Sequence, residues 1–293
     1  MGPISIPREL AVTQKAEGGA WVRALPALVD RMVERWDLSI VGPAMHGMAG
    51  LVLPVTRAGE QAVLKLQPVE PDNMDVATGL RTWNGDGAVL LLDHDEETGA
   101  VLLERLSART LTSVEDPLPI LAGLLDRLTS VAAPPGIRQL SDVARAMVQA
   151  TPAATPLLRD EERALVRWCA DAVAELVDDA GDRLLHWDLH YENVLAGDRE
   201  PWLAIDPHPL AGDPGFDLLP AIDNLLAGKD IPATTRRRFD ALVEMVALER
   251  DRSVVWTLGR VLQNALWDIE DGKTALDPTQ VAIGTTMIEM TRR

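Results

Sequence analysis

The chain has 293 residues, of which 47% are hydrophobic and 25% are charged, which is enough for about two domains with apolar cores and excludes a disordered protein. Its net charge of −17 argues against nucleic acid as a partner and favours a cationic one. The single cysteine, Cys169, excludes an internal disulfide and is expected to pack in a helix core.

The N-terminal sequence MGPISIPREL contains neither a basic region nor an apolar run, so no signal peptide is expected. No apolar stretch approaches the length that would span a membrane. We therefore expect a cytoplasmic protein without a membrane partner, acting as a monomer.

The first part of the sequence predicts a helix followed by strands. Apolar residues recur at helical spacing in 18–36. The runs GLVLPV at 50–55 and QAVLKL at 61–66 flank a polar turn, as in a β-hairpin. Residues 72–84 predict a short helix that ends at NGDG, and residues 88–106 predict a second hairpin around a glycine-containing turn.

Beyond residue 107 the pattern is typical of helices. Apolar residues recur at helical spacing in 117–131, 139–150, 159–180, 235–250, 253–270 and 278–291. The exception is 183–206, where short apolar runs surround a dense polar cluster. We therefore expect an α+β chain with a β-rich N-terminal lobe, 1–107, and a mainly helical C-terminal lobe, 108–293.

The polar cluster lies in the sequence LHWDLHYEN. His186, Asp188 and His190 alternate, so they point to one side of an extended backbone. Asn193 follows Asp188 by five positions, and the run PWLAIDPHP places another acid, Asp206, at the end of an apolar stretch. Phosphoryl transfer needs these groups: a carboxylate for the hydroxyl proton, and an amide and a second carboxylate for Mg²⁺, which prefers oxygen ligands.

HWDLHYEN followed by AID resembles the catalytic loop and metal-binding aspartate of the aminoglycoside phosphotransferases, whose fold is protein-kinase-like. The likeness continues through GDPGFDLLPAIDN, WTLGRVLQNALWDIEDG and LLDHDEETGAVLLERL, and so covers almost the whole chain. These segments most resemble the streptomycin 6-kinase and hydroxyurea phosphotransferase group. The resemblance implies a bilobal fold and ATP- and Mg²⁺-dependent phosphorylation of a cationic aminoglycoside, most closely the 6-hydroxyl of streptomycin, which confers antibiotic resistance.

The resemblance also implies roles for individual residues. Asp188 takes the role of catalytic base, braced by His186, while Asn193 and Asp206 become Mg²⁺ ligands. Lys65 in AVLKL matches the strand lysine that contacts the nucleotide phosphates. Its alternation with apolar neighbours is also that of any half-exposed strand.

The nucleotide site is less sharply marked. The phosphate loop is expected in GPAMHGMAGLVLPV, with backbone contacts near Gly47 and Gly50, although these glycines do not spell the kinase motif. Asp72 and Asp75 are candidates for the acid that pairs with the strand lysine. Adenine is expected at the seam between the lobes, hydrogen-bonded to backbone at Glu104–Leu106.

The pocket that binds a cationic acceptor should be acidic and partly aromatic. NALWDIEDG places Asn264, Trp267, Asp268 and Asp271 at a spacing of three and four, hence on one helix face. A solvated helix end is the alternative reading of the same pattern.

Four further polar residues follow the metal aspartate. We expect Asp213 to brace its loop and Asp217 to cap a helix start. Asp223 and Asn224 are lesser candidates for the acceptor site.

Other functions compete with this interpretation. The same fold could act on hydroxyurea, a sugar or another hydroxylated amine, because fold does not fix substrate. The presence of Asp188, Asn193 and Asp206 together argues against a catalytically inactive nucleotide-binding module. A metal-dependent hydrolase would leave the strand lysine and the asparagine unexplained. Its ligands would be His186, Asp188, His190, Asp206 and His208.

Overall fold

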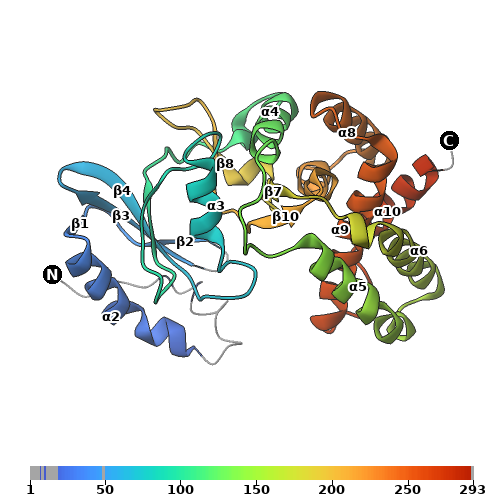
Figure 1. Ribbon diagram of the computed structural model, residues 1–293, viewed down its shortest axis with the longest axis horizontal. Helices are drawn as coiled ribbons and strands as arrows, with labels where there is room; N and C mark the ends of the chain where they lie inside the picture. Colours follow the sequence, from blue (N-terminus) through green and yellow to red (C-terminus); the bar gives the residue numbers. More distant parts are fainter. Residues whose placement is uncertain (1–6, 8–9, 11–18, 48–49, 292–293) are drawn as a thin grey trace.

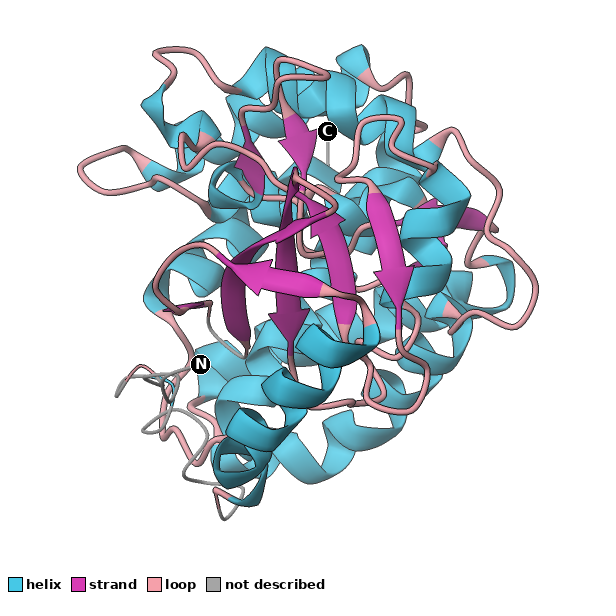
Figure 2. Ribbon diagram, turned by 90° about the vertical axis from the view of Figure 1, so that its left-hand side faces the viewer, coloured by secondary structure: helices cyan, strands magenta, loops and turns pink. Residues whose placement is uncertain are grey.

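The computed structural model describes residues 7, 10, 19–47 and 50–291, and its elements form two lobes side by side (Figure 1). The sheet lobe contains α2 (Ala20–Arg35) and one antiparallel sheet in the order β1-β3-β4-β6-β5, with β2 also paired to β3 (Figure 2). Its strands are β1 (Leu38–Ile40), β2 (Met45–His46), β3 (Leu51–Arg57), β4 (Glu60–Leu66), β5 (Leu91–His94) and β6 (Val101–Glu104).

The sheet lobe has its own hydrophobic core. Leu25, Val29 and Met32 recur at helical spacing on α2 and are buried together with the apolar residues of β3 and β4. Both predicted hairpins are present. The sequence pattern missed β1 and β2, because strands of 3 and 2 residues are too short to establish a period.

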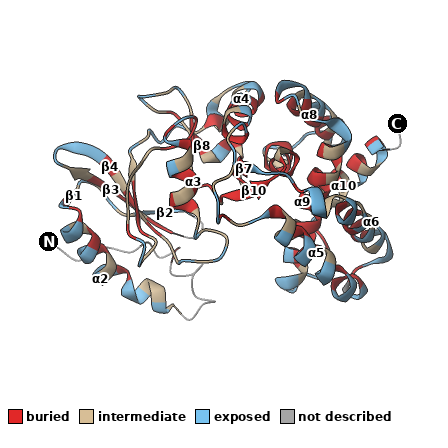
Figure 3. Cartoon of the chain, viewed as in Figure 1, coloured by how far each residue is buried: buried red, intermediate tan, exposed pale blue. Residues whose placement is uncertain are grey.

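The helical lobe is built around α9, most of whose residues are buried (Figure 3). All six predicted helices are present, and the pattern missed only the five-residue α7. The helices are α4 (Leu118–Thr129), α5 (Leu140–Ala154), α6 (Asp160–Leu176), α7 (Leu219–Asp223), α8 (Ile231–Met245), α9 (Arg250–Glu270) and α10 (Pro278–Thr291). Among the described residues, no helix is both long and apolar enough to cross a membrane.

Helix α8 begins earlier than the predicted range 235–250. The Asp230 side chain accepts a hydrogen bond from the amide of Ala233 at 2.9 Å and so caps the helix at this earlier position. Pro232 follows in the first turn, where its missing N–H costs nothing.

Two small antiparallel sheets of two strands each hold the polar segments of the helical lobe. Strand β7 (Arg183–Leu185) pairs with β10 (Leu210–Gly212), and β8 (Val194–Leu195) pairs with β9 (Leu203–Ala204). The residues between β7 and β8, called the 186–193 loop below, therefore emerge next to the residues that follow β9.

Helix α3 (Val76–Trp83) lies between the sheet and the helical lobe (Figure 1). Its buried residues Val76, Leu80 and Trp83 belong to the core of the helical lobe, and the Trp83 indole N–H donates to the carbonyl of Leu128 at 3.0 Å. The helix is therefore anchored mainly from the helical side.

One arginine, which lies between β8 and β9, joins the α3–β5 connection to the end of β6. Arg199 donates to the carbonyls of Gly85 and Ala88, at 2.6 and 3.1 Å, in the connection from α3 to β5. It also donates to the carboxylate of Glu104 at 2.7 Å, where β6 leads into the helical lobe.

Candidate active site

The 186–193 loop is held by a buried carboxylate. Asp217 accepts hydrogen bonds from the backbone amides of His186 and Trp187, at 2.7 and 2.9 Å. Trp187 has a positive φ of 67°, an uncommon conformation for a residue of its size. Burial raises the pKa of Asp217 to about 7. These contacts fix the backbone immediately before Asp188.

The prediction that Asp217 caps a helix is therefore wrong. Asp213 has that role: its side chain accepts from the amide of Gly215 at 2.8 Å at the start of a short 3-10 helix. Asp213 also forms an ion pair with Arg252 on α9. The two aspartates are four positions apart, and only the folding of their loop decides which one reaches which backbone.

His186 connects the loop to the segment after β9. Its ring is fully buried, and Nε2 lies 3.1 Å from the carbonyl of Ile205. Because a carbonyl can only accept, this nitrogen must donate. Burial lowers the pKa of His186 to about 4, so the ring is neutral. The backbone carbonyl of His186 also accepts from the amide of His208 at 3.0 Å.

Asp188 and Asn193 lie together at the mouth of the loop. The Asn193 side-chain nitrogen donates to the backbone carbonyl and to Oδ2 of Asp188, at 2.9 and 3.1 Å. Its amide oxygen is thereby left for another partner. His190 Nδ1 accepts from the amide of Glu192, so Nε2, 3.5 Å from Asp188 Oδ2, carries the proton. Burial opposes ionisation of Asp188, but His190 and Arg260 outweigh it and lower its pKa to about 2.

Lys65 reaches Asp206 across the two lobes. The lysine projects from β4 and forms an ion pair with the Asp206 carboxylate, which follows β9, although 141 positions separate them in the sequence. Burial opposes the ionised form of Asp206, and the lysine outweighs it, so the pKa of the carboxyl lies below its usual range. The backbone of Asp206 has a φ of 63°.

Neither candidate acid for Lys65 contacts it. Asp72 Oδ2 lies 3.8 Å from Nδ1 of His208, and Asp75 accepts from the backbone amide of Arg138 at 3.1 Å. Both aspartates therefore connect the start of α3 to the helical lobe.

The expected phosphate loop connects β2 to β3, and its residues 48–49 lie outside those that the structure describes. The amide of Gly47 donates to the carbonyl of Gly50 at 3.1 Å, and His46 pairs with Leu51. A Cβ at Gly50 would lie 2.8 Å from the carbonyl oxygen of Leu66, whereas a Cβ at Gly47 would meet nothing within 4 Å. Close packing against β4 therefore requires glycine at position 50 but not at position 47.

The expected adenine contacts lie where β6 ends. Glu104 is the last residue of β6, and its carboxylate binds Arg199. In the described part of the chain, the backbone N–H and carbonyl of Leu106 have no intramolecular hydrogen-bond partner. The next residue, Ser107, donates to the carbonyl of Ala196 at 2.9 Å.

Two adjoining cavities open beside Asp188. The smaller, about 210 Å³, is lined by Asp188, His190, Arg260 and the α7 end, and the larger, about 410 Å³, lies between the ends of α9 and α10. Three residues line both cavities: Asp223, Asn264 and Trp267.

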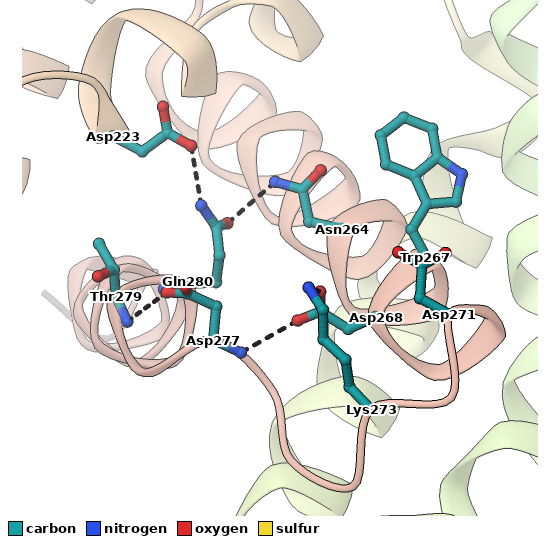
Figure 4. A pocket seen from close by; sticks show the side chains of 9 residues that line it. All are labelled: Asp223, Asn264, Trp267, Asp268, Asp271, Lys273, Asp277, Thr279 and Gln280. Carbon is teal, nitrogen blue, oxygen red and sulfur yellow. Dashed lines mark hydrogen bonds and ion pairs between the residues drawn. The ribbon is translucent and has the colours of Figure 1, made fainter. Parts of the chain in front are cut away.

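The structure brings all four predicted acceptor residues to the larger cavity (Figure 4). Asn264 and Trp267 also face the smaller one, whereas Asp271 lies at the exposed rim. Asp268 is engaged: it pairs with Lys273 and accepts from the amide of Asp277 at 3.0 Å. Both carboxylate oxygens of Asp268 therefore have partners within the protein, and the residue forms part of the cavity wall.

Asp223, given less weight than the helix-end acids, lies closer to the loop. Gln280 joins it to Asn264: the glutamine donates to Asp223 Oδ2 at 2.8 Å and accepts from the Asn264 side chain at 3.2 Å. Burial raises the pKa of Asp223 to about 6. The sequence offered no signal for Gln280, which comes from α10.

Arg260 was also absent from the predicted site. It is buried on α9 and donates to the backbone carbonyl of Trp187 at 3.2 Å and to the side-chain oxygen of Gln263. The same Gln263 oxygen accepts from the Trp187 indole N–H at 3.1 Å. Arg260 and Gln263, called the Trp187 clamp below, thus hold both ends of the residue that precedes Asp188.

The histidines do not converge as a hydrolase site would require. His186 binds a backbone carbonyl, His190 faces Asp188, and His208 lies near Asp72. Within the described ranges, histidine, cysteine, aspartate and glutamate side chains form no group of three placed to hold a metal ion.

A sheet lobe with a strand lysine, a helical lobe with an Asp-x₄-Asn loop, and a second aspartate after the next hairpin together define a protein-kinase-like phosphotransferase. A family model described as "Aminoglycoside/hydroxyurea antibiotic resistance kinase" matches residues 35–272. The chain belongs to this family.

Curated relatives match nearly the whole chain. It is 54% identical to a streptomycin 6-kinase of Streptomyces glaucescens, over 97% of each chain. It is 49% identical to a hydroxyurea phosphotransferase of Kitasatospora aureofaciens, over 97% of this chain and 86% of that one.

Solved structures confirm the fold. Aminoglycoside phosphotransferase APH(4)-Ia is similar with a TM-score of 0.61 and 16% identity, over 90% of this chain and 97% of the other. A choline kinase, LicA from Streptococcus pneumoniae, is similar with a TM-score of 0.57 and 14% identity, over 91% and 99%. The expected bilobal, kinase-like α+β fold is therefore correct.

Proposed function

We propose that this protein transfers the γ-phosphoryl group of ATP to a hydroxyl of a cationic aminoglycoside, namely the 6-hydroxyl of streptomycin, and so confers resistance. The observation that carries the chemistry is the meeting of Lys65 with Asp206 beside Asp188 and Asn193. The acceptor assignment draws on the relatives named streptomycin 6-kinase and on the acidic cavity next to Asp188.

Asp188 is the proposed base. It is ionised at every ordinary pH, and Oδ2 is occupied by Asn193 and His190, which leaves Oδ1 for the acceptor hydroxyl. The hydroxyl oxygen attacks the γ-phosphorus in line, the bond to the bridging oxygen of ADP breaks, and the hydroxyl proton passes to Asp188. A carboxylate of low pKa suffices, because phosphoryl transfer asks mainly for positioning and charge stabilisation.

Asn193 and Asp206 are the proposed Mg²⁺ ligands. The donor set fits, because the Asn193 amide nitrogen faces Asp188, its oxygen has no hydrogen-bond partner among the described residues, and Asp206 is a carboxylate. When bound, Mg²⁺ neutralises charge on the phosphates. Lys65, now paired with Asp206, is the proposed phosphate contact.

We further propose that residues 1–107 hold the nucleotide and residues 108–293 supply catalysis and the acceptor site. Backbone groups near Gly47 and Gly50 are the proposed phosphate contacts. The free backbone groups of Leu106, beside Glu104, are the proposed partners of adenine. Two solved APH(4)-Ia complexes are described as containing ADP or AMP-PNP with hygromycin B.

The test is an acceptor panel with ATP and Mg²⁺, in which the phosphate is located on the product by ³¹P-coupled NMR. We expect phosphate on the 6-oxygen of streptomycin. Hydroxyurea is the second candidate acceptor because a relative bears that name. Exclusive turnover of hydroxyurea, or phosphate at another streptomycin position, contradicts the proposal.

A further inference from the structure

The two acceptor-side cavities meet at Asp223, Asn264 and Trp267, called the junction below. Asp188 lines the smaller cavity, so a group held at the junction lies next to an acceptor oxygen at Asp188. We propose that the junction recognises a planar N–C–N group, either a guanidinium or a urea, carried close to the hydroxyl that receives phosphate. This inference rests on the proposed function and specifies its acceptor.

Trp267 provides a flat surface at the junction. Its side chain is 44% exposed, yet its ring is fixed by stacking on Trp187, with centroids 6.4 Å apart and planes inclined by 15°. The guanidinium of Arg260 already lies over this ring, 5.4 Å from its centroid. An indole face suits a planar guanidinium or urea, whereas a compact, tetrahedral ammonium cannot stack on it.

The polar groups of the junction call for hydrogen-bond donors. Gln280 occupies Asp223 Oδ2 and the Asn264 side-chain nitrogen (Figure 4). In the part of the chain that the structure describes, Asp223 Oδ1 and Asn264 Oδ1 have no intramolecular partner. Two fixed acceptor oxygens beside an aromatic face match the in-plane N–H groups of guanidinium or urea.

The same chemistry accounts for the two substrates named among the relatives. Streptomycin and hydroxyurea differ greatly in size and charge. Both nevertheless contain a planar N–C–N group, a guanidinium in the first and a urea in the second. A junction that recognises a planar group with N–H donors, rather than charge alone, can bind both substrates.

Four small acceptors separate planarity from charge. Streptidine is planar and charged at its guanidinium groups, and streptamine, with amines on the same ring, is charged but not planar. Hydroxyurea is planar and uncharged, and myo-inositol is neither. With AMP-PNP and Mg²⁺ present, calorimetry should give streptidine about ten- to a hundredfold tighter binding than streptamine, since the in-plane pair of N–H donors and the stacking are both lost in the amine. Equal affinities overturn the inference.

Substitution of the flat surface supplies the second readout. Trp267→Leu should lower kcat/KM for streptidine and hydroxyurea by about three- to thirtyfold and leave streptamine unchanged, and Trp267→Phe should recover part of the loss. A uniform loss for all acceptors overturns the inference. If the wild type binds streptidine selectively but transfers no phosphate to any of these compounds or to streptomycin, the proposed function fails while the recognition stands. Equal turnover of streptidine and streptamine would support the proposed phosphotransfer but contradict the proposed recognition of a planar N–C–N group.

Discussion

Asp188 is kept ionised by its neighbours rather than by exposure to water. Burial opposes its charge, but the hydrogen bond from His190 and the nearby Arg260 outweigh burial and lower its pKa to about 2. Asn193 and His190 leave one carboxylate oxygen for a substrate. At the scale of single residues, the proposed base is therefore a preorganised carboxylate that needs no change of protonation before it takes a proton.

Asp188→Asn should lower kcat by about 10²–10⁴-fold, because the amide keeps the shape of the carboxylate and loses its ability to take a proton. The KM for ATP should change little, since the nucleotide contacts proposed here lie elsewhere. Steady-state kinetics with streptomycin measure both values. The matched control is Asp198→Asn in the exposed β8–β9 turn. A kcat close to that of this control would mean that Asp188 is not the base.

Asp223 should make acceptor binding depend on pH. Burial raises its pKa to about 6, so the carboxyl takes up a proton as the pH falls through 6 and the cavity loses a negative charge. Asp188, His190 and Arg260 face it, and Asp188 stays ionised throughout this range. The KM for a cationic acceptor should rise below about pH 6. Asp223→Asn should raise the KM at neutral pH and abolish this dependence, and a variant with the wild-type pH profile would refute the assignment.

At the scale of elements, the β2–β3 turn and α9 each place one part of the site. The turn packs Gly50 against the carbonyl of Leu66 on β4, the strand that carries Lys65. Helix α9 contributes, from one face, the Trp187 clamp and the junction residues Asn264 and Trp267. The packing of each element therefore determines where a residue of the proposed site lies.

Gly50→Ala should destabilise the turn and raise the KM for ATP. The added Cβ would lie 2.8 Å from a backbone carbonyl oxygen, so β3 must shift away from β4, at a cost of about 1–3 kcal/mol. Gly47→Ala is the matched control, because its Cβ would meet nothing within 4 Å and the backbone amide is kept. Thermal melts and ATP kinetics on both variants provide the measurement, and equal effects would contradict the argument.

Loss of the Trp187 clamp should misplace Asp188. Arg260→Lys keeps the charge but cannot reach Trp187 and Gln263 together, whereas Arg260→Met removes the charge as well. Both should lower kcat by about ten- to a hundredfold through misalignment. Only the methionine variant should raise the pKa values that govern the acid limb of kcat/KM, because Asp188 and Asp223 both lose a positive neighbour.

The control for the clamp is Arg250→Met, at the exposed start of the same helix. It should leave both kcat and the pH profile unchanged. Identical pH profiles for Arg260→Lys and Arg260→Met would show that Arg260 acts on packing alone.

At the scale of the whole molecule, charge and lobe arrangement act together. The chain carries a net charge of −17, and five aspartates line the two cavities described above. The two lobes meet through Lys65 and Asp206 and through the contacts of Arg199 with Gly85 and Glu104. A cationic acceptor is thus attracted toward the same seam that holds the proposed nucleotide site.

The kcat/KM for streptomycin should fall as ionic strength rises past roughly 0.1 M, where the Debye length is about 10 Å. Hydroxyurea is uncharged, so its kcat/KM should not respond to salt and it provides the internal control. A parallel decline for both acceptors would indicate a general salt effect on the enzyme rather than attraction of the cation.

Much of this protein could be predicted from local patterns. The β-rich then helical order follows from hydrophobic periods of two and then about 3.6 residues. The HWDLHYEN loop and the AID aspartate are recognisable because phosphoryl transfer demands particular groups at short spacings. Lys65 was ambiguous by itself, since a half-exposed strand has the same alternation, and only the loop downstream gave it a function.

Other features depended on contacts between distant segments, which no local pattern encodes. Asp217 reaches the backbone of His186 across 31 positions, and the Trp187 clamp spans 73. Lys65 pairs with Asp206 across 141 positions rather than with a nearby acid. Sequence periodicity reports which face of an element is apolar, and motif spacing reports which groups are adjacent in the chain. Which carboxylate meets which cation, and which residues share a cavity, is decided only when the lobes and helices pack against one another.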